Sequence, residues 1–263
     1  MHAARRVLVW GEDPMAPLLL PDFLATGGLL FAFQESSISG LAIIAALFIA
    51  SIFSWSVMIT KFRMIRFARK QTERFFVIFR KNRQPLHVYE TGLTFEGSPA
   101  YAVYRAGCEE LTFQMLGSTE VDDTFGARVE VADRISPAQM RAVSVAMERA
   151  VGESGLRMES QMIILATAVS GSPFLGLLGT VWGVMDTFSG VALAGTPNLT
   201  AMAPGVSAAL LTTVIGLLVA IPAMFGYNFL VTSLRALIVQ TDNFAAELSS
   251  DFEHRFVNYD RQG

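Results

Sequence analysis

Two apolar stretches in the second half of the chain carry small and hydroxyl-bearing side chains at helical spacing. In GSPFLGLLGTVWGVMDTFSG (171–190), one face carries Gly176, Gly179, Thr180, Gly183, Asp186, Thr187 and Gly190. In the following stretch, the corresponding face carries Gly205, Ala209, Thr212, Thr213, Gly216, Ala220 and Ala223. Such faces suit two roles in a bilayer. They let helix backbones approach closely, or their hydroxyls line a polar pathway for an ion.

Close helix packing is the simpler interpretation of these residues. Lipid offers no hydrophobic gain when helices meet, so small residues stabilise the contact by allowing dispersion contacts between backbones. This explains the glycines, namely Gly176, Gly179, Gly183 and Gly216. It explains the threonines less well, although a threonine hydroxyl can donate to a carbonyl of its own helix. On these residues alone, packing is favoured over a polar pathway.

The composition is that of a membrane protein. Of the 263 residues, 52% are hydrophobic and only 16% are charged, which is unlike an ordinary soluble domain. The net charge of −3 and the scattered basic residues argue against a nucleic-acid partner. The single cysteine, Cys108, cannot form an internal disulfide and is expected to be a reduced packing residue. Motifs for an ATPase, a zinc protease or a serine hydrolase are missing, so we expect neither an enzyme nor a metal or cofactor site.

Three runs are long and apolar enough to cross a bilayer, which needs about 20 residues. We therefore predict an all-α membrane protein with transmembrane helices at 38–60, 161–190 and 205–233. Nine Lys or Arg residues follow the first run within 61–83, whereas 18–37 contain none. The positive-inside rule then orients every segment. It predicts a periplasmic N-terminal segment 1–37, a cytoplasmic helical region 61–160, a periplasmic loop 191–204 and a cytoplasmic C-terminal helix 234–263.

The N-terminus and the cytoplasmic region carry further local signals. The apolar run before Gly11 is too short for a secretory signal, so the first span is predicted to be an uncleaved signal anchor, and Met15 is an alternative start. Ser98 before Pro99 predicts a helix start, and Ser136 with Gln139 predicts a capping box.

The apolar stripe that begins after Ser136 predicts one helix that runs on through Met158 into the second span, with Gly152 and Gly155 as weak points. A similar stripe predicts that the third span continues into the cytoplasm. The acidic segment 120–133 is predicted to be a solvated loop.

The motifs GLLGTVWGVMDTF and MAPGVSAALLTTVIGLLVAIPAMFGYNFL resemble the TolQ/ExbB family of proton-channel subunits, relatives of MotA. The predicted topology agrees with this family from end to end, and its three spans fit the TolQ/ExbB branch better than MotA, which has four. SWSVMITKFRMIRFARKQTERF and TDNFAAEL look closer to TolQ. The resemblance leaves the paralogue, the ion and the outer-membrane target open.

The resemblance implies a homopentamer in the bacterial inner membrane, with the second and third helices around a central pore. It implies a TolR- or ExbD-like single-span partner with a membrane aspartate, and a TolA- or TonB-like protein that receives the work. By position, Thr180 and Thr213 match the family's pore-facing threonines, whose hydroxyls could solvate a carboxyl or hold water. We expect Thr187 and Thr212 on the same pathway, and Pro222 to kink its helix and shape the inner half of the pore.

One position departs from the family. The motif PGVSAAL places Ala208 where the family usually has a glutamate, so this chain offers no intramembrane carboxylate there. Asp186 lies near the outer end of the second span, where exposure at the interface is the favoured explanation. The titrating group is then expected to come mainly from the partner. A passive oligomeric scaffold without ion conduction is the alternative function.

Overall fold

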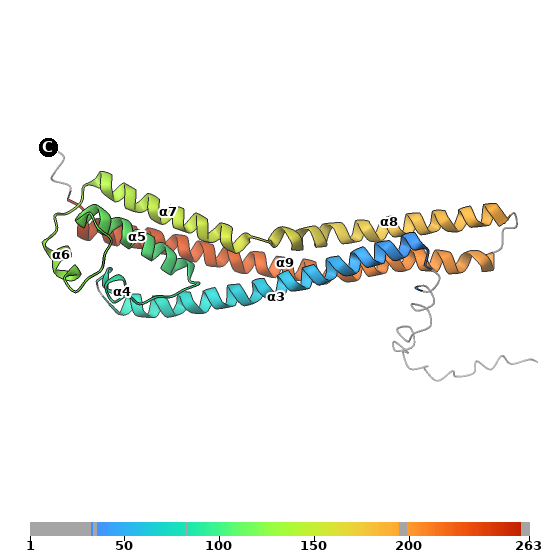
Figure 1. Cartoon of the computed structure of the whole chain (residues 1–263), viewed down its shortest axis with the longest axis horizontal. Helices are drawn as coiled ribbons and strands as arrows, with labels where there is room; N and C mark the ends of the chain where they lie inside the picture. Colours follow the sequence, from blue (N-terminus) through green and yellow to red (C-terminus); the bar gives the residue numbers. More distant parts are fainter. Residues whose placement is uncertain (1–32, 34–35, 83, 195–198, 259–263) are drawn as a thin grey trace, which may run out of the picture. The chain divides into compact units, whose positions relative to one another are not determined.

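The structure, a computed structural model, describes residues 33, 36–82, 84–194 and 199–258. These residues form seven α-helices (Figure 1): α3 (Ile38–Lys81), α4 (His87–Glu90), α5 (Pro99–Leu116), α6 (Phe125–Val131), α7 (Pro137–Glu159), α8 (Met162–Ala194) and α9 (Leu199–Phe256). Within the described ranges the only β-type pairing is an isolated bridge between Ile135 and Val257. The predicted all-helical class is confirmed.

Three of these helices, α3, α8 and α9, are long and apolar enough to cross a membrane. The structure gives them different bounds from the predicted spans, because α3 runs on to Lys81, α8 to Ala194 and α9 from Leu199 to Phe256. Most of the predicted N-terminal segment, including Met15, lies outside the described residues, as does 195–198.

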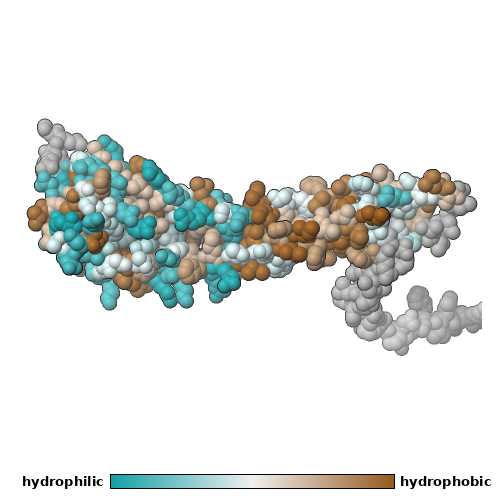
Figure 2. All heavy atoms as spheres, in the orientation of Figure 1, coloured by the Kyte–Doolittle hydropathy of each residue, from teal (hydrophilic) through white to brown (hydrophobic). Residues whose placement is uncertain are grey.

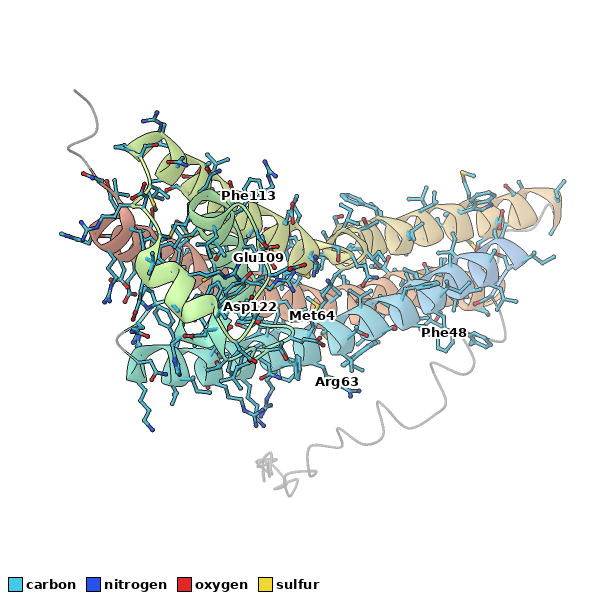
Figure 3. All side chains as sticks on the ribbon, turned by 60° about the vertical axis from the view of Figure 1, so that its left-hand side comes forward. Phe48, Arg63, Met64, Glu109, Phe113 and Asp122 are labelled. Atoms are coloured by element: carbon cyan, nitrogen blue, oxygen red, sulfur yellow. The ribbon has the colours of Figure 1, made fainter. Side chains whose placement is uncertain are left out.

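The chain divides into two compact units. One combines Met1–Leu47 with Pro173–Leu217, and the other combines Phe48–Ser172 with Leu218–Gly263. Apolar side chains remain exposed on the helices that can cross a membrane, for example Phe48 at 65% on α3 and Phe174 at 72% on α8. Figure 2 shows hydrophobic surface over α8 and over the first parts of α3 and α9, and mostly hydrophilic surface over α5 to α7, and in Figure 3 Phe48 and Arg63 point outward from α3. The exposed apolar faces suit contact with lipid or other helices.

The core of the larger unit is built around Phe75 of α3, which is completely buried. Six aromatic rings lie with their centroids 5.3–5.7 Å from that of Phe75: Phe76, Phe79, Phe95, Tyr101, Tyr104 and Phe244. These distances fall in the range favoured by tilted and edge-to-face aromatic pairs. The cluster joins α3, α5 and α9.

Both predicted helix starts are confirmed. The Ser98 side chain accepts from the backbone N–H of Tyr101 with Pro99 in the first turn of α5. Ser136 and Gln139 form the reciprocal capping box at the start of α7. These side chains satisfy backbone N–H groups that have no partner inside the helix.

The predicted continuous helix from α7 into α8 is wrong. Helix α7 ends at Glu159 and α8 begins at Met162, because Gln161 adopts a left-handed conformation with φ of 65°. Gly152 and Gly155, the expected weak points, stay inside α7.

Lys61 of α3 contacts the end of α7. It is 2% exposed, and its Nζ donates to the Met158 carbonyl at 3.1 Å and to Ser160 Oγ at 3.2 Å. A cation at the C-terminal end of a helix is favourable for the helix dipole.

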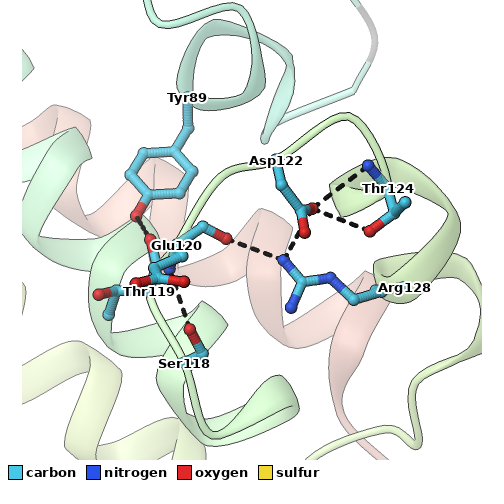
Figure 4. Close-up of polar contacts among 7 residues, drawn as sticks. All are labelled: Tyr89, Ser118, Thr119, Glu120, Asp122, Thr124 and Arg128. Atoms are coloured by element: carbon cyan, nitrogen blue, oxygen red, sulfur yellow. Dashed lines mark hydrogen bonds and ion pairs between the residues drawn. The ribbon is translucent and has the colours of Figure 1, made fainter.

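The acidic segment predicted as a loop contains the short helix α6 (Figure 4). Arg128 of α6 donates through one Nη to the Glu120 carbonyl at 2.9 Å and to Asp122 Oδ1 at 3.0 Å. The Thr124 side chain donates to the same carboxylate at 2.9 Å, and this bond, helped by Arg128, lowers the pKa of Asp122. These polar contacts stabilise the short helix α6, which lacks the apolar stripe of a longer helix.

We predict that Cys108 does not react with thiol reagents in the folded protein. It is completely buried, and burial raises the pKa of its thiol, so the reactive thiolate is absent. Maleimide should leave it unmodified between pH 7 and 9, a range in which a free thiol with a pKa of about 8.5 ionises. Full modification should follow denaturation, as measured by intact mass. Glu148→Cys, at an exposed position on α7, is the control and should take one label natively; equal native labelling of Cys108 would contradict the prediction.

Candidate functional site

Helices α8 and α9 approach very closely in the smaller unit, and glycines make this approach geometrically feasible. A Cβ placed on Gly176 would lie 2.9 Å from the Thr212 carbonyl oxygen and 3.0 Å from Thr213 Cα. A Cβ on Gly183 would lie 2.7 Å from Ala209 Cβ. Real side chains essentially never come so near, so this seam between α8 and α9 accepts only glycine without adjustment.

Two threonines hold the seam by hydrogen bonds. Thr212 Oγ1 and Thr213 Oγ1 each donate to the Gly176 carbonyl oxygen at 3.0 Å, and Thr212 also bonds the Ala209 carbonyl at 2.7 Å. Thr212 is buried at 1% exposure, whereas Thr213 is half-buried. The single hydroxyl hydrogen of Thr212 is shared between the two carbonyls, and the hydroxyl contacts at Gly176 add to the helical N–H bond that its carbonyl accepts inside α8. The hydroxyls therefore tie α9 to one particular turn of α8.

The other two predicted pathway threonines bond within their own helix. Thr180 Oγ1 donates to the Leu177 carbonyl at 2.7 Å, and Thr187 Oγ1 donates to the Gly183 carbonyl at 2.8 Å. Among the described residues no hydrogen bond links Thr180 with Thr213, so the structure does not join the two family-matched hydroxyls directly.

The remaining predicted packing residues occupy different places. A Cβ on Gly179 would clash with the Thr212 side chain, and Gly216 lies opposite Gly176. Pro222 belongs to the larger unit, where it is half-buried and α9 continues through it without interruption.

A cavity of about 190 Å³ lies beside the seam, between the start of α3 and helices α8 and α9. Asp186, Thr187 and Thr212 line it together with Ala208, the residue at the family's glutamate position. Ser39 Oγ of α3 donates to Asp186 Oδ2 at 2.9 Å. The sequence analysis missed this contact, because it joins residues 147 positions apart and a serine near the start of a span carries no signal by itself.

In the described ranges, no cluster of three or more histidine, cysteine or acidic side chains is suited to a metal ion. The chemistry available at the site is that of hydroxyls, helix carbonyls and one carboxylate. Such groups can accept and donate hydrogen bonds and bind a proton.

We predict that Gly176→Ala destabilises the folded protein by about 1–3 kcal/mol, the usual cost of overpacking. The added methyl would meet backbone atoms of α9, which cannot rotate away as a side chain can. Gly190→Ala is the matched control, since it lies in α8 with open space around it and should be neutral or stabilising by up to about 1 kcal/mol. The thermal midpoint of the detergent-solubilised protein measures both effects. Equal midpoints for the two variants would contradict the close approach.

Comparison with protein families matches residues 117–243 to the MotA/TolQ/ExbB proton channel family. The chain is 32% identical to the biopolymer transport protein ExbB of Pseudomonas putida over 217 residues, which are 81% of this chain but 61% of that protein. It is 32% identical to the Tol-Pal system protein TolQ of Haemophilus influenzae over 218 residues, covering 83% of this chain and 90% of the relative. For TolQ of Pseudomonas aeruginosa, the identity is 30% over 228 residues, with coverage of 86% and 92%.

The match to the two TolQ proteins therefore runs through nearly their whole length, and the family match at 117–243 includes the α8–α9 seam. This agrees with the motifs around the α8–α9 seam, on which the resemblance was first based. This membrane protein belongs to the MotA/TolQ/ExbB proton channel family.

Proposed function

We propose that this chain is an inner-membrane subunit of a motor driven by the proton-motive force, of the TolQ–TolR or ExbB–ExbD type. It would energise a TolA- or TonB-like protein for envelope integrity or outer-membrane transport. The family match, which includes the α8–α9 seam, is the observation that carries this proposal. The relatives include a TolQ and an ExbB that are each 32% identical to this chain, so the comparisons support both types.

The hydroxyls of the seam have a chemistry that suits a proton pathway. Thr180 and Thr213 each donate their one hydroxyl hydrogen to a helix carbonyl. Their oxygens therefore have only acceptor capacity left for other groups. Both side chains are half-buried in the isolated chain, so they remain accessible in part. We propose that they accept hydrogen bonds from water or from the protonated carboxyl of a single-span TolR- or ExbD-like partner.

A homopentamer with α8 and α9 around the pore completes the proposed architecture. Helix α8 leaves large apolar side chains exposed, among them Phe174, Val181 and Met185 at 56–72%. In a monomer these side chains would all face lipid, whereas in an oligomer part of them would pack against neighbouring subunits. Native mass measurement of the purified protein checks the subunit number.

A passive oligomeric scaffold is the second candidate function. It is supported by the fact that all four threonine hydroxyls already have a carbonyl partner in the chain. On this interpretation the threonines contribute to packing alone, and function would follow assembly.

A double variant, Thr180→Val with Thr213→Val, distinguishes the motor from the scaffold. Valine keeps the shape and the β-branch while removing the hydroxyl, at a cost on the order of 1 kcal/mol for each hydrogen bond. We expect the double variant to assemble and to retain its partner in co-purification. It should fail to restore envelope integrity in cells that lack the chain.

The matched control is the pair Thr167→Val and Thr232→Val. These residues lie on the same two helices, and each hydroxyl donates to a carbonyl of its own helix, at 2.8 and 2.9 Å, as the hydroxyl of Thr180 does. The control pair should restore integrity fully. Full restoration by the assembled Thr180 and Thr213 variant would remove the case for a polar pathway at these hydroxyls.

The proposed orientation has an N-terminus in the periplasm and a C-terminus in the cytoplasm. A reporter that works only in the cytoplasm should be active when fused within residues 100–130 or at the C-terminus, and inactive when fused at Pro197. The reason is the excess of Lys and Arg after the first span. The opposite activity pattern would reverse every inside and outside assignment.

A further inference from the structure

The cavity beside the α8–α9 seam contains a carboxylate without a cationic partner. Within the described parts of the smaller unit, residues 36–47, 173–194 and 199–217, there is no Lys, Arg or His, and Asp186 is the only acidic residue. The neutral hydroxyl of Ser39 donates to its Oδ2 at 2.9 Å. Within these residues, the negative charge of Asp186 therefore has only the Ser39 hydroxyl and the contents of the cavity to stabilise it.

The cavity is suited to water. Its volume of about 190 Å³ is enough for several water molecules at about 30 Å³ each. Asp186 is exposed, so the cavity is open to the surface of the chain. Small residues such as Gly40 and Ala208 leave the space free, and polar atoms of Asp186 and Thr187 face it. Water there has the several polar partners that it needs.

The polar walls favour a proton or another cation over an anion. Thr187 and Thr212 donate their hydroxyl hydrogens to helix carbonyls, so toward the cavity they present acceptor oxygens only. An anion would be repelled by these oxygens and by the carboxylate. Asp186 lies eight residues before the end of α8 at Ala194, about 12 Å along the helix axis. A charge inside a membrane helix is costly unless it is solvated, paired or neutralised.

We propose that Asp186 is a proton-binding group that this chain itself contributes. The carboxylate accepts a proton from a hydronium ion in the cavity: an O–H bond of the hydronium breaks and leaves water, an O–H bond to the carboxylate forms, and the group passes from a charge of −1 to neutral. Release to water breaks that bond and restores the charge. That this proton binding helps to drive a motor rests on the proposed function. Proton binding at Asp186 itself does not.

Ala208 gives the proposal a specific geometric test. It is 4% exposed and lines the same cavity from α9, across from Asp186 on α8. A glutamate at position 208 would extend its carboxyl toward this space. The cavity therefore has one carboxyl, and it comes from the α8 wall.

The first experiment measures proton binding without any assay of function. Dicyclohexylcarbodiimide, an apolar reagent that modifies protonated carboxyl groups, is added to membranes that contain the full chain. Peptide mass spectrometry should find Asp186 modified at least tenfold more than Asp122. Asp122 is the control, because its exposed carboxylate bonds to Thr124 and Arg128. Modification of Asp186 that is no greater than that of Asp122 would overturn the proposal.

The second experiment measures function in cells that lack the chain. Asp186→Asn should assemble normally by native mass and lose at least tenfold in restored envelope integrity, while Asp186→Glu should retain it. The double variant Asp186→Asn with Ala208→Glu should recover function, because it returns a carboxyl to the same cavity. Full activity of Asp186→Asn, or no recovery by an assembled double variant, would overturn the role of the cavity carboxyl. Failure of the unaltered chain to restore integrity would instead contradict the proposed function, and the carbodiimide result would still decide proton binding.

Discussion

The contact between α8 and α9 at Gly176 is the constraint on which the smaller unit depends. One carbonyl oxygen accepts two threonine hydroxyls at 3.0 Å, and the space where a Cβ would stand is taken by backbone atoms of α9. Close approach and hydrogen bonding reinforce each other here, since the hydroxyls reach the carbonyl only when the backbones are near. The contact thereby fixes which residues of the two helices face each other.

That register determines what lies farther along the helix pair. Seven residues beyond Gly176, Gly183 meets Ala209, and both residues also line the cavity that contains Asp186. The same small residues thus serve two purposes. They let the helices touch at one level and leave space for polar groups at the next. Of the two roles that the sequence pattern suggested, close packing is seen at Gly176 and Gly183, whereas the polar pathway stays a prediction.

Much of the fold follows from sequence rules that act locally. Apolar runs of sufficient length predicted three membrane-crossing helices, and the side chains of Ser98 and Ser136 predicted two helix starts. The break after Glu159 could not be predicted in this way, because it depends on the left-handed backbone conformation of Gln161, which residues other than glycine seldom adopt. Helix α6 was missed because polar contacts of Arg128, and not apolar periodicity, hold it. At the site, the small and hydroxyl-bearing faces could be read from spacing. The bond between Ser39 and Asp186 could not, since only the tertiary fold brings them together.

The break between α7 and α8 takes its hydrogen-bond donor from a third helix. Ser160 and Gln161 interrupt the helical backbone there, so the last carbonyl groups of α7 have no N–H of a following turn to accept from. The buried Lys61 ammonium of α3 donates to the Met158 carbonyl and to Ser160 Oγ. Loss of this one ammonium would therefore leave the buried end of α7 without that donor.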